Sequence, residues 1–237
     1  MGTDKFDRQL DIFQIKLNQK QKEQFEKYYK LLAEWNRVMN LTGITERGEV
    51  YEKHFVDSLA LVNSVDIHKV HTVIDVGTGA GFPGIPLKIS FPHLKVTLLD
   101  SLNKRIKFLD KVITELGLQD ITTIHGRAED FAKRKEYREQ FDLCVSRAVA
   151  NLSTLSEYCI PYIRVGGIFL SYKSATADEE TEQAKKAISI LGARIGKREK
   201  YTLPECDIHR SFIKIIKEKP TPAKYPRKAG IPAKEPL

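Results

Sequence analysis

A glycine-rich segment in the first half of the chain has the residue types of a nucleotide-binding turn. An apolar run leads into an acidic residue, Asp75; Gly77, Gly79 and Gly81 then alternate, and helix-like sequence comes next. A turn this tight needs a positive φ angle, which glycine adopts without steric cost, and the missing side chains let a ligand approach the backbone. A strand, a glycine turn and a helix N-terminus together predict a site for a nucleotide-like ligand.

The position of Asp75 relative to the glycines narrows the class of ligand. The dinucleotide fingerprint G-x-G-x-x-G fails when it is counted from Gly77, because Phe82 stands at the third glycine position. It fits when it is counted from Gly79, but that frame begins late relative to the end of the strand. The order acidic-x-G-x-G-x-G, which starts at Asp75, is similar to motif I of the class I S-adenosylmethionine methyltransferases. A glycine cluster without a ligand is the alternative, which the strand–loop–helix context disfavours.

A second acidic residue, Asp100, ends the next apolar run, 95–100. A carboxylate at the tip of the second strand can accept hydrogen bonds from both ribose hydroxyls of an adenosine. Helix capping is the other interpretation, because a helical stretch, 104–116, follows and Asp is a common N-cap. Both roles are compatible with one loop, and the glycine turn upstream favours the ribose role.

Strands and helices are predicted to alternate after residue 71. This alternation predicts a mostly parallel sheet with helices on both faces, and a ligand at the carboxyl ends of the strands. Asp75–Gly81, Asp100, the 126–129 turn and Ser146–Arg147 all fall at such ends. The expected strands are 72–76, 96–100, 121–125, 141–146, 167–172 and 212–217, and the expected helices are 103–116, 128–137, 152–160 and 177–191.

The first 70 residues are predicted to form a helical extension. Asn18 with Gln21 resembles a capping box, and apolar residues follow at three-and-four spacing, so one helix should pack on the main domain. A second helix is expected over 50–62. His54 and Asp57 lie one turn apart on it and could face a substrate cleft; a packing or solvent role is an equal alternative, and neither is assigned a catalytic role.

Composition favours a cytoplasmic protein that neither binds a metal nor crosses a membrane. The three cysteines, Cys144, Cys159 and Cys206, have no metal-ligand spacing and an odd count, which indicates a reducing compartment. No signal peptide is recognisable, and no apolar run approaches membrane-spanning length. A monomer is expected, because no pattern indicates an obligate dimer.

The net charge of +8 is concentrated in the last third of the chain. Residues 166–237 hold 15 basic and nine acidic side chains, whereas residues 1–70 hold 11 of each. The proline-rich tail 219–237 should be extended, since its prolines disfavour helix. An extended basic arm with one aromatic ring suits RNA, so Tyr225, Arg227 and Lys228 are predicted to bind it. Lys173 is predicted to bind RNA as well, because it follows the fifth strand and lies nearest the expected cleft. Nine basic side chains and the tail could hold RNA phosphates: Lys133, Arg134, Lys135, Arg138, Lys173, Arg194, Lys197, Arg198, Lys200 and 219–237.

Several strings together resemble one family, the bacterial small-subunit ribosomal RNA guanine-N7 methyltransferases, once called glucose-inhibited division protein B. The resemblance runs over essentially the whole chain. The glycine loop alone indicates only a methyltransferase. Its Gly-Phe-Pro-Gly84 continuation narrows the resemblance from methyltransferases in general to this family. The matching strings are Trp35-Asn36, Asn40-Leu41-Thr42, 75–84, 100–105, Gly126-Arg-Ala-Glu129, Ser146-Arg-Ala148 and Tyr225-Pro-Arg-Lys228.

The resemblance implies a class I, Rossmann-like fold with a mostly parallel seven-stranded sheet over 71–218. It implies S-adenosylmethionine (S-adenosyl-L-methionine) as the methyl donor and a guanine of small-subunit RNA, near the decoding centre, as the acceptor. Carried over by position, Gly77 and Phe82 would line the donor site, and Gly79 and Gly81 would shape its loop. Asp100 would hold the ribose, and Ala128 and Glu129 would contact the adenosine end. Arg147 would lie beside both the donor and the acceptor.

The absence of other signatures favours a ring nitrogen as the acceptor atom. Methylation of an exocyclic amine usually comes with an Asn/Asp-Pro-Pro-aromatic motif, but the chain reads Ser146-Arg-Ala-Val there. Methylation of pyrimidine C5 needs a cysteine nucleophile, and Cys144 and Cys159 look buried and inactive. Guanine N7 needs only in-line positioning, which is worth about 7–11 kcal/mol.

Arg147 is predicted to orient rather than to act on N7, because methylation places positive charge on the guanine. Its guanidinium can pair with guanine O6, a phosphate or the donor's carboxylate. A structural salt bridge to Asp75 or Glu129 is the alternative. Two other functional classes stay open at this point: an NAD-dependent oxidoreductase, and a non-catalytic RNA-binding or ribosome-assembly factor.

Overall fold

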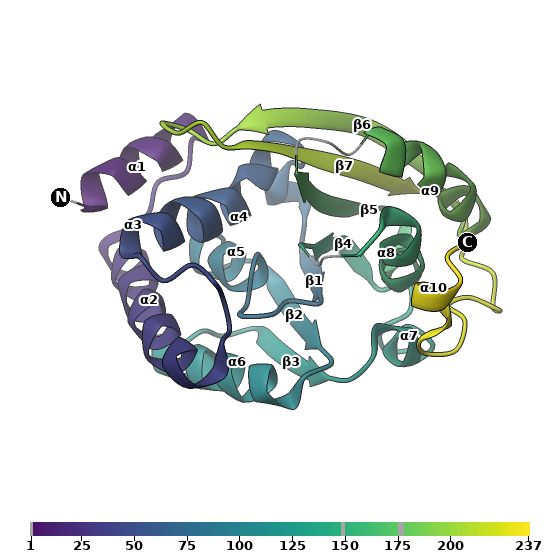
Figure 1. The fold of residues 1–237 in the computed structure, drawn as a ribbon, viewed down its shortest axis with the longest axis horizontal. Coiled ribbons are helices and arrows are strands. Elements are labelled where there is room, and N and C mark those ends of the chain that lie inside the picture. Colours follow the sequence, from purple (N-terminus) through teal and green to yellow (C-terminus); the bar gives the residue numbers. More distant parts are fainter. Residues whose placement is uncertain (1, 148–149, 175–177) are drawn as a thin grey trace.

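The computed structural model describes residues 2–147, 150–174 and 178–237. Ala148, which ends one of the strings that carry the resemblance, and Ala177, where a helix was predicted to begin, lie outside the described residues. Within them the chain forms an α/β structure in which helices cover both faces of one sheet (Figure 1).

The sheet has seven strands in the order β3-β2-β1-β4-β5-β7-β6. Strands β1 to β5 run parallel to one another, and β7 lies between β5 and β6 and is antiparallel to both. The predicted mostly parallel, seven-stranded sheet is therefore confirmed. The strands are β1 Thr72–Val76, β2 Lys95–Asp100, β3 Ile121–His125, β4 Phe141–Ser146, β5 Ile163–Ser174, β6 Ala193–Thr202 and β7 His209–Lys217.

Two predictions of secondary structure were wrong. Strand β6 was missed, because its basic side chains hide the apolar alternation; as an edge strand, it tolerates them. The helix expected over 128–137 ends at Phe131. The residues that follow, 133–136, are exposed, so a longer helix would have no apolar face to bury there.

The helices divide into two groups, one on each face of the sheet (Figure 1). Each group buries its own hydrophobic cluster against the strands. The first group comprises α1 Gly2–Ile12, α2 Gln19–Met39, α3 Arg47–Val50, η1 Tyr51–Val56, α4 Asp57–Leu59, η2 Ala60–Asn63, η3 Ile67–Lys69, α5 Gly84–Ser90 and α6 Asn103–Leu116; the second comprises α7 Ala128–Phe131, α8 Leu152–Cys159, η4 Ile160–Tyr162, α9 Asp178–Ile190 and α10 Ile231–Lys234.

The N-terminal helices pack directly on the glycine loop. Helix α2 begins with the predicted capping box, in which Asn18 and Gln21 exchange hydrogen bonds. Further along α2, the buried Tyr28 donates its hydroxyl proton to the Ala80 carbonyl oxygen at 2.5 Å. The rings of Tyr28 and Phe55 lie 5.5 and 6.1 Å from the ring of Phe82. The extension therefore forms one wall of the site that the loop creates.

The tail is docked on the domain, so the prediction of an extended arm was wrong. Helix α10 forms within it, and the Tyr225 ring is buried in the core cluster on the α8 side. Arg227 donates from Nε to Oε1 of Glu157 and from Nη2 to Oε2, and the Glu157 side chain is 1% exposed. A buried carboxylate requires such a partner, and this outweighs the preference of the prolines for extended backbone. Lys228 is exposed.

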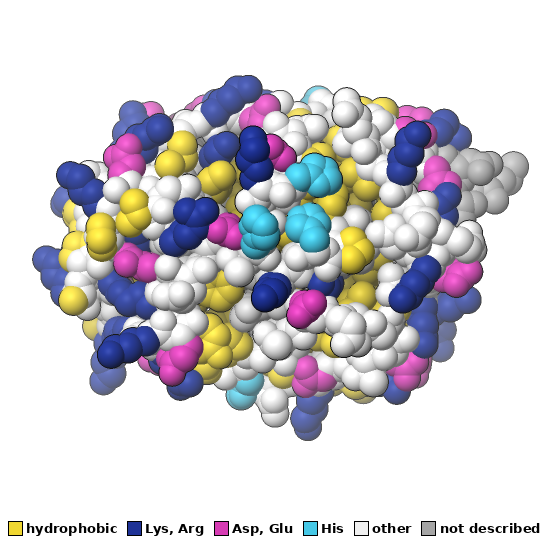
Figure 2. Space-filling model, turned by 180° about the vertical axis from the view of Figure 1, so that it is seen from behind, with side chains coloured by type: hydrophobic (Ala, Val, Ile, Leu, Met, Phe, Trp, Pro, Cys, Tyr) yellow, Lys and Arg dark blue, Asp and Glu magenta, His cyan; other side chains and the backbone are white. Residues whose placement is uncertain are grey.

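The surface opposite the view of Figure 1 carries basic and acidic side chains side by side (Figure 2). Across the described part of the chain, many basic residues form ion pairs: Arg194 with Glu218, Arg198 with Asp178, and Lys173 with Glu180. No helix in the described ranges is long and apolar enough to cross a membrane.

Candidate active site

The loop after β1 is built around the carboxylate of Asp75. Its Oδ2 accepts a hydrogen bond from the Thr78 hydroxyl at 2.7 Å and another from the Gly84 backbone N–H at 2.8 Å. Gly77, Gly79 and Gly81 have φ angles of 72°, 63° and 100°. These left-handed conformations account for the spacing of the glycines, because side chains are strained there.

Asp75 itself is fully buried, and burial raises the pKa of its carboxyl group to about 7. The bonds from Thr78 and Gly84 act in the opposite direction, as they favour the charged form. Its second oxygen, Oδ1, has no hydrogen-bond partner among the described residues. Asp75 thus shapes the loop from beneath and does not reach the cavity.

A cavity of about 400 Å³ lies above the loop. Five of the predicted donor-site residues line it: Gly77, Gly79, Phe82, Asp100 and Arg147. A Cβ atom added to Gly79 would meet no atom within 4 Å and would project into open space, whereas one added to Gly81 would lie 2.8 Å from the Tyr28 hydroxyl. The bare backbone at Gly79 therefore forms a cradle that fits the ligand class predicted from the sequence.

The Asp100 carboxylate connects the loop to the second strand. Its Oδ2 accepts from the Gly79 N–H at 2.9 Å and pairs with Arg105 at 3.2 Å, while Oδ1 accepts from the Leu102 N–H at 2.9 Å. The contact with Leu102 is a local turn before α6 and not a helix cap, because the N-cap residue of α6 is Leu102 and no side chain caps that helix. The contact with Gly79 places the Asp100 carboxylate at the cavity wall. The helix-capping interpretation of Asp100 was therefore wrong, and its contact with the ribose stays a prediction.

Three predicted donor-site residues are not among those that line this cavity: Gly81, Ala128 and Glu129. Glu129 is 2% exposed, and its Oε1 accepts a hydrogen bond from the Gly230 N–H of the tail at 2.9 Å. The Ala128 carbonyl accepts from the Tyr162 hydroxyl at 2.6 Å. In this structure both residues bind other parts of the chain.

A second, larger cavity of about 670 Å³ adjoins the first, and His54 and Arg147 line both. Its other walls come from the η1–α4 segment, the ends of β5 and β7, and the start of α8. Lys173 lines it, with its amino group bonded to Glu180 and to the Ala150 carbonyl, and its contact with RNA stays a prediction. The two cavities and their shared wall are the geometry expected of a two-substrate enzyme.

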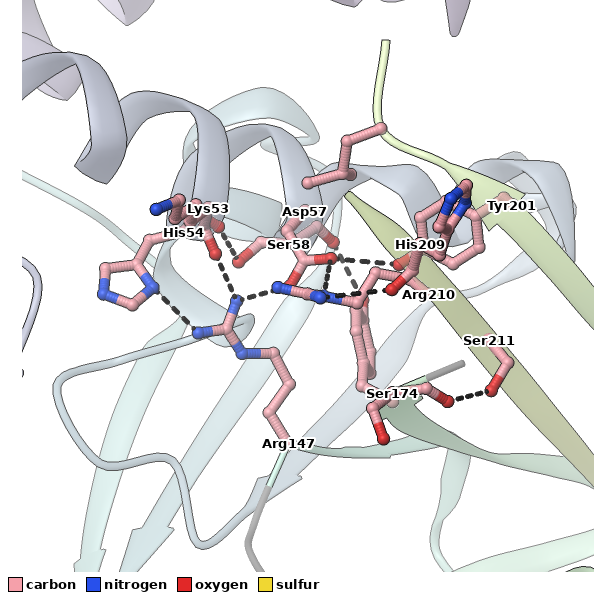
Figure 3. A network of polar contacts seen from close by, with 12 residues as sticks. Lys53, His54, Asp57, Ser58, Arg147, Ser174, Tyr201, His209, Arg210 and Ser211 are labelled. Atoms are coloured by element: carbon pink, nitrogen blue, oxygen red, sulfur yellow. Dashed lines mark hydrogen bonds and ion pairs between the residues drawn. The ribbon is translucent and has the colours of Figure 1, made fainter. Parts of the chain in front are cut away.

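The partners of Arg147 differ from those anticipated (Figure 3). Its Nη1 donates to Asp57 Oδ2 at 2.9 Å, and its Nη2 donates to His54 Nδ1 at 3.0 Å. The predicted alternative, a salt bridge to Asp75 or Glu129, was wrong. The signal that could have identified the true partners was present, because His54 and Asp57 lie one turn apart on one predicted helix. Sequence alone, however, does not bring that helix beside residue 147.

Neither of the two buried cysteines, Cys144 and Cys159, lies in an environment that would activate its thiol as a nucleophile. Cys144 and Cys159 are both buried, and burial raises the pKa of the Cys144 thiol well above its ordinary value. A thiol of this kind stays protonated and inert. Within the described ranges, no group of three or more His, Cys, Asp or Glu side chains is arranged to hold a metal ion.

Comparison with known proteins identifies the family. Residues 21–207 match the GidB family, described as rRNA small subunit methyltransferase G. The chain belongs to this family. It is 50% identical to the ribosomal RNA small subunit methyltransferase G of Bacillus pumilus over 100% of this chain and 99% of that protein. The enzyme of the same name from Lachnoclostridium phytofermentans is 53% identical over 93% of this chain and 91% of its own length.

Solved structures agree on the fold. The apo form of the S-adenosylmethionine-dependent methyltransferase SibL superposes with a TM-score of 0.55 at 16% identity, covering 83% of this chain and 70% of that one. TYW2 of M. jannaschii, in complex with AdoMet, gives 0.50 at 14% identity, over 63% and 70%. The protein is therefore a small-subunit ribosomal RNA methyltransferase of the GidB family that uses S-adenosylmethionine, as the sequence predicted.

Proposed function

We propose that the protein transfers a methyl group from S-adenosylmethionine to N7 of one guanine in small-subunit ribosomal RNA near the decoding centre. The observation that carries the proposal is the pair of adjoining cavities with His54 and Arg147 in their common wall. One cavity has the glycine cradle for the donor, and the other is large enough for a base that has been turned out of its stack. The enzyme would act as a monomer in the cytoplasm.

The donor brings an activated methyl group on a sulfonium. The chain's own contribution would be to bind and orient the donor. Gly77 and Gly79 would admit it close to the backbone, the Asp100 carboxylate would accept from the ribose hydroxyls, and Phe82 would form an apolar wall. Gly81, Ala128 and Glu129 would shape the ends of the same site.

The site favours a reaction that needs no general base. Burial lowers the pKa of the His54 imidazole to about 3, and the Arg147 cation adds to that effect. The nearby carboxylates, Asp57 and Asp100, are held in hydrogen bonds to cationic or N–H groups. N7 of guanine has a free lone pair at neutral pH, so it can attack once it is aligned with the methyl group and the sulfur, without losing a proton.

Arg147 would orient the two substrates from their shared wall. Its guanidinium can pair with guanine O6, a phosphate or the donor's carboxylate, and it lies 5.4 Å from the Phe82 ring. Exposed basic residues such as Lys228 would hold RNA phosphates. For Lys173 and Arg227 to do so, each would first have to break its ion pair, with Glu180 and Glu157 respectively. Tyr225 would have to leave its buried position before it could stack on a base.

The test is a transfer assay with a labelled methyl group on small subunits that lack the modification, followed by cleavage at N7-methylguanine to map the position. Arg147→Ala should lower turnover about 10²-fold, as expected when one preorganised donor is removed. Arg164→Ala is the control, since Arg164 forms an ion pair with Asp142 at the other end of β4. A label that resists cleavage at N7-methylguanine would exclude the proposed atom, and unchanged turnover in Arg147→Ala would exclude the proposed role.

A further inference from the structure

Three side chains meet at the wall between the cavities, and they come from two distant parts of the sequence (Figure 3). His54 and Asp57 lie on the η1–α4 segment, and Arg147 directly follows β4. The segment contains a π-helical turn, in which the Asp57 N–H donates to the Glu52 carbonyl five residues back. Such turns are rare and are frequent at functional sites, because the wider turn changes the direction in which side chains point.

His54 accepts a hydrogen bond from Arg147 and donates one to Thr42. An arginine can only donate, so the 3.0 Å contact to Arg147 Nη2 makes Nδ1 of His54 the acceptor. The ring is then neutral with its proton on Nε2, which lies 2.9 Å from the Thr42 hydroxyl oxygen. The imidazole also stacks on the Phe82 ring, with the centroids 4.5 Å apart. His54 therefore links Arg147 to the glycine loop.

Asp57 holds the other end of the guanidinium. Its Oδ2 accepts from Arg147 Nη1 at 2.9 Å, while its Oδ1 accepts from the Tyr201 hydroxyl at 3.0 Å and lies 3.4 Å from Arg210 Nε. The Asp57 side chain is only 6% exposed. Asp57 lines the larger cavity, but both of its carboxylate oxygens are bonded to protein groups, so its effect is expected to pass through the arginines.

The two contacts leave one edge of Arg147 free. Nη1 is used by Asp57 and, at 3.4 Å, by the Lys53 carbonyl, and Nη2 is used once by His54. Nε–H and the second Nη2 proton have no acceptor among the described residues. These two N–H groups can form a fork that matches two oxygen acceptors, and a fork works best when its plane is fixed beforehand.

We propose that His54 and Asp57 are positioning residues that clamp the Arg147 guanidinium, so that its free fork faces the reacting groups in a fixed orientation. The inference rests on the proposed function for what the fork binds, but the clamp itself is a property of the protein alone. It predicts that loss of the clamp impairs turnover more than it impairs binding, because the charge of Arg147 remains while its orientation is lost.

The first measurement concerns the clamp without any substrate. In nitrogen-detected NMR spectra of the unliganded protein, His54 should show the neutral tautomer with the proton on Nε2. The Arg147 guanidinium, assigned by its absence in Arg147→Lys, should exchange and rotate at least tenfold more slowly than that of the exposed Arg37. Asp57→Asn should remove this difference. An Arg147 signal as mobile as that of Arg37 in the unaltered protein would overturn the proposal.

The second measurement is steady-state kinetics of methyl transfer. Asp57→Asn should lower kcat about 10²-fold, as expected when a positioned group is misplaced, while the Kd of the donor and the KM of the RNA change only a few-fold. The matched control is Asp142→Asn, because Asp142 is also ion-paired with an arginine and bonded to backbone N–H groups, but at the opposite end of β4. Equal kcat values for the two variants would overturn the clamp.

A third variant covers the case in which Asp57→Asn does not fold. His54→Phe keeps the ring stacked on Phe82 but removes the acceptor for Nη2, and it should lower kcat about tenfold and loosen the Arg147 signals. Full activity together with unchanged signals would count against the clamp. If the unaltered protein shows the rigid Arg147 signals but transfers no methyl group to small-subunit RNA, the proposed function fails and the clamp stands.

Discussion

At the scale of single residues, Asp75 makes the glycine loop sensitive to pH. Its carboxyl group has a pKa of about 7 in the folded protein, because it is buried, against an ordinary value of 3.8. A raised pKa means that the folded state binds the proton more tightly than the unfolded chain. The resulting stability is fully present below about pH 4 and is lost as the pH rises through about 7.

Asp75→Asn should remove this part of the pH dependence. Between pH 5 and pH 8 the unfolding free energy of the unaltered protein should fall by about 2–3 kcal/mol more than that of the variant. Urea unfolding of both proteins at the two pH values measures the difference. Other titrating groups are shared by the two proteins and cancel, so parallel pH profiles would contradict the buried, proton-binding state of Asp75.

Gly79 and Gly117 allow backbone strain to be separated from ligand binding. Their φ angles are +63° and +61°, and in both cases an added Cβ would meet nothing within 4 Å. Alanine at either position should therefore cost about 1–2 kcal/mol of unfolding free energy. Only Gly79 lines the donor cavity, so calorimetry should show donor binding weakened at least tenfold in Gly79→Ala and unchanged in Gly117→Ala. Equal affinities would show that the cradle is not used.

The residues that sequence could identify are those whose chemistry is local. Asp75 and the glycines share one turn, and Asp100 ends the adjacent strand, so their pattern alone places them at one edge of a sheet. The contact of Asp57 with Arg147 spans 90 positions in the sequence. Its existence depends on how the N-terminal helices pack across the sheet, which no local pattern encodes.

At the scale of elements, the tail shows how a composition argument fails. Prolines and basic residues indicated an extended arm. The tail, however, contains Arg227, the cation that pairs with the buried carboxylate of Glu157, which lies 70 positions before it in the chain. The Arg138 guanidinium adds bonds to the Thr221 and Tyr225 carbonyls, and the Lys217 amino group bonds to the Thr221 hydroxyl. The missed strand β6 has a similar cause, since its place at the edge of the sheet permits a sequence that does not look like a strand.

Arg227→Ala should release the tail and destabilise the protein. It leaves the Glu157 carboxylate buried without its cation, for which the cost is about 3–5 kcal/mol. Denaturant unfolding measures the loss, and limited proteolysis should cut the variant within 219–237. The control is Lys234→Ala, at an exposed position of the same tail. A variant as stable and as resistant as the control would mean that the docked tail contributes little.

At the scale of the whole molecule, RNA binding should be driven by electrostatic attraction, although the surface carries both positive and negative charges. Paired side chains such as Arg194 and Arg198 contribute less positive field than their number suggests. The exposed Lys133 and Lys135 lie in a short segment after α7 and carry no ion pair among the described residues.

The affinity for RNA should therefore fall steeply with salt, whereas the affinity for the donor should change little. Binding titrations between about 50 and 200 mM salt measure the slope of the logarithm of the RNA affinity against the logarithm of the salt concentration. Lys133→Ala with Lys135→Ala should reduce that slope by about 1 per phosphate contact removed. A slope near zero for the unaltered protein would contradict an electrostatic footprint.

The shared wall of the two cavities also matters to inhibition. His54 and Arg147 line both spaces, so a single molecule could place an adenosine-like portion above Gly79 and a purine-like portion beside Lys173, with its linker passing Arg147. Joining two weak fragments in this way makes the second binding step intramolecular, and the compound can exceed either fragment in affinity by 10²–10⁴-fold when the linker fits. Escape from such a compound by mutation of Arg147 would also remove the residue on which turnover is proposed to depend.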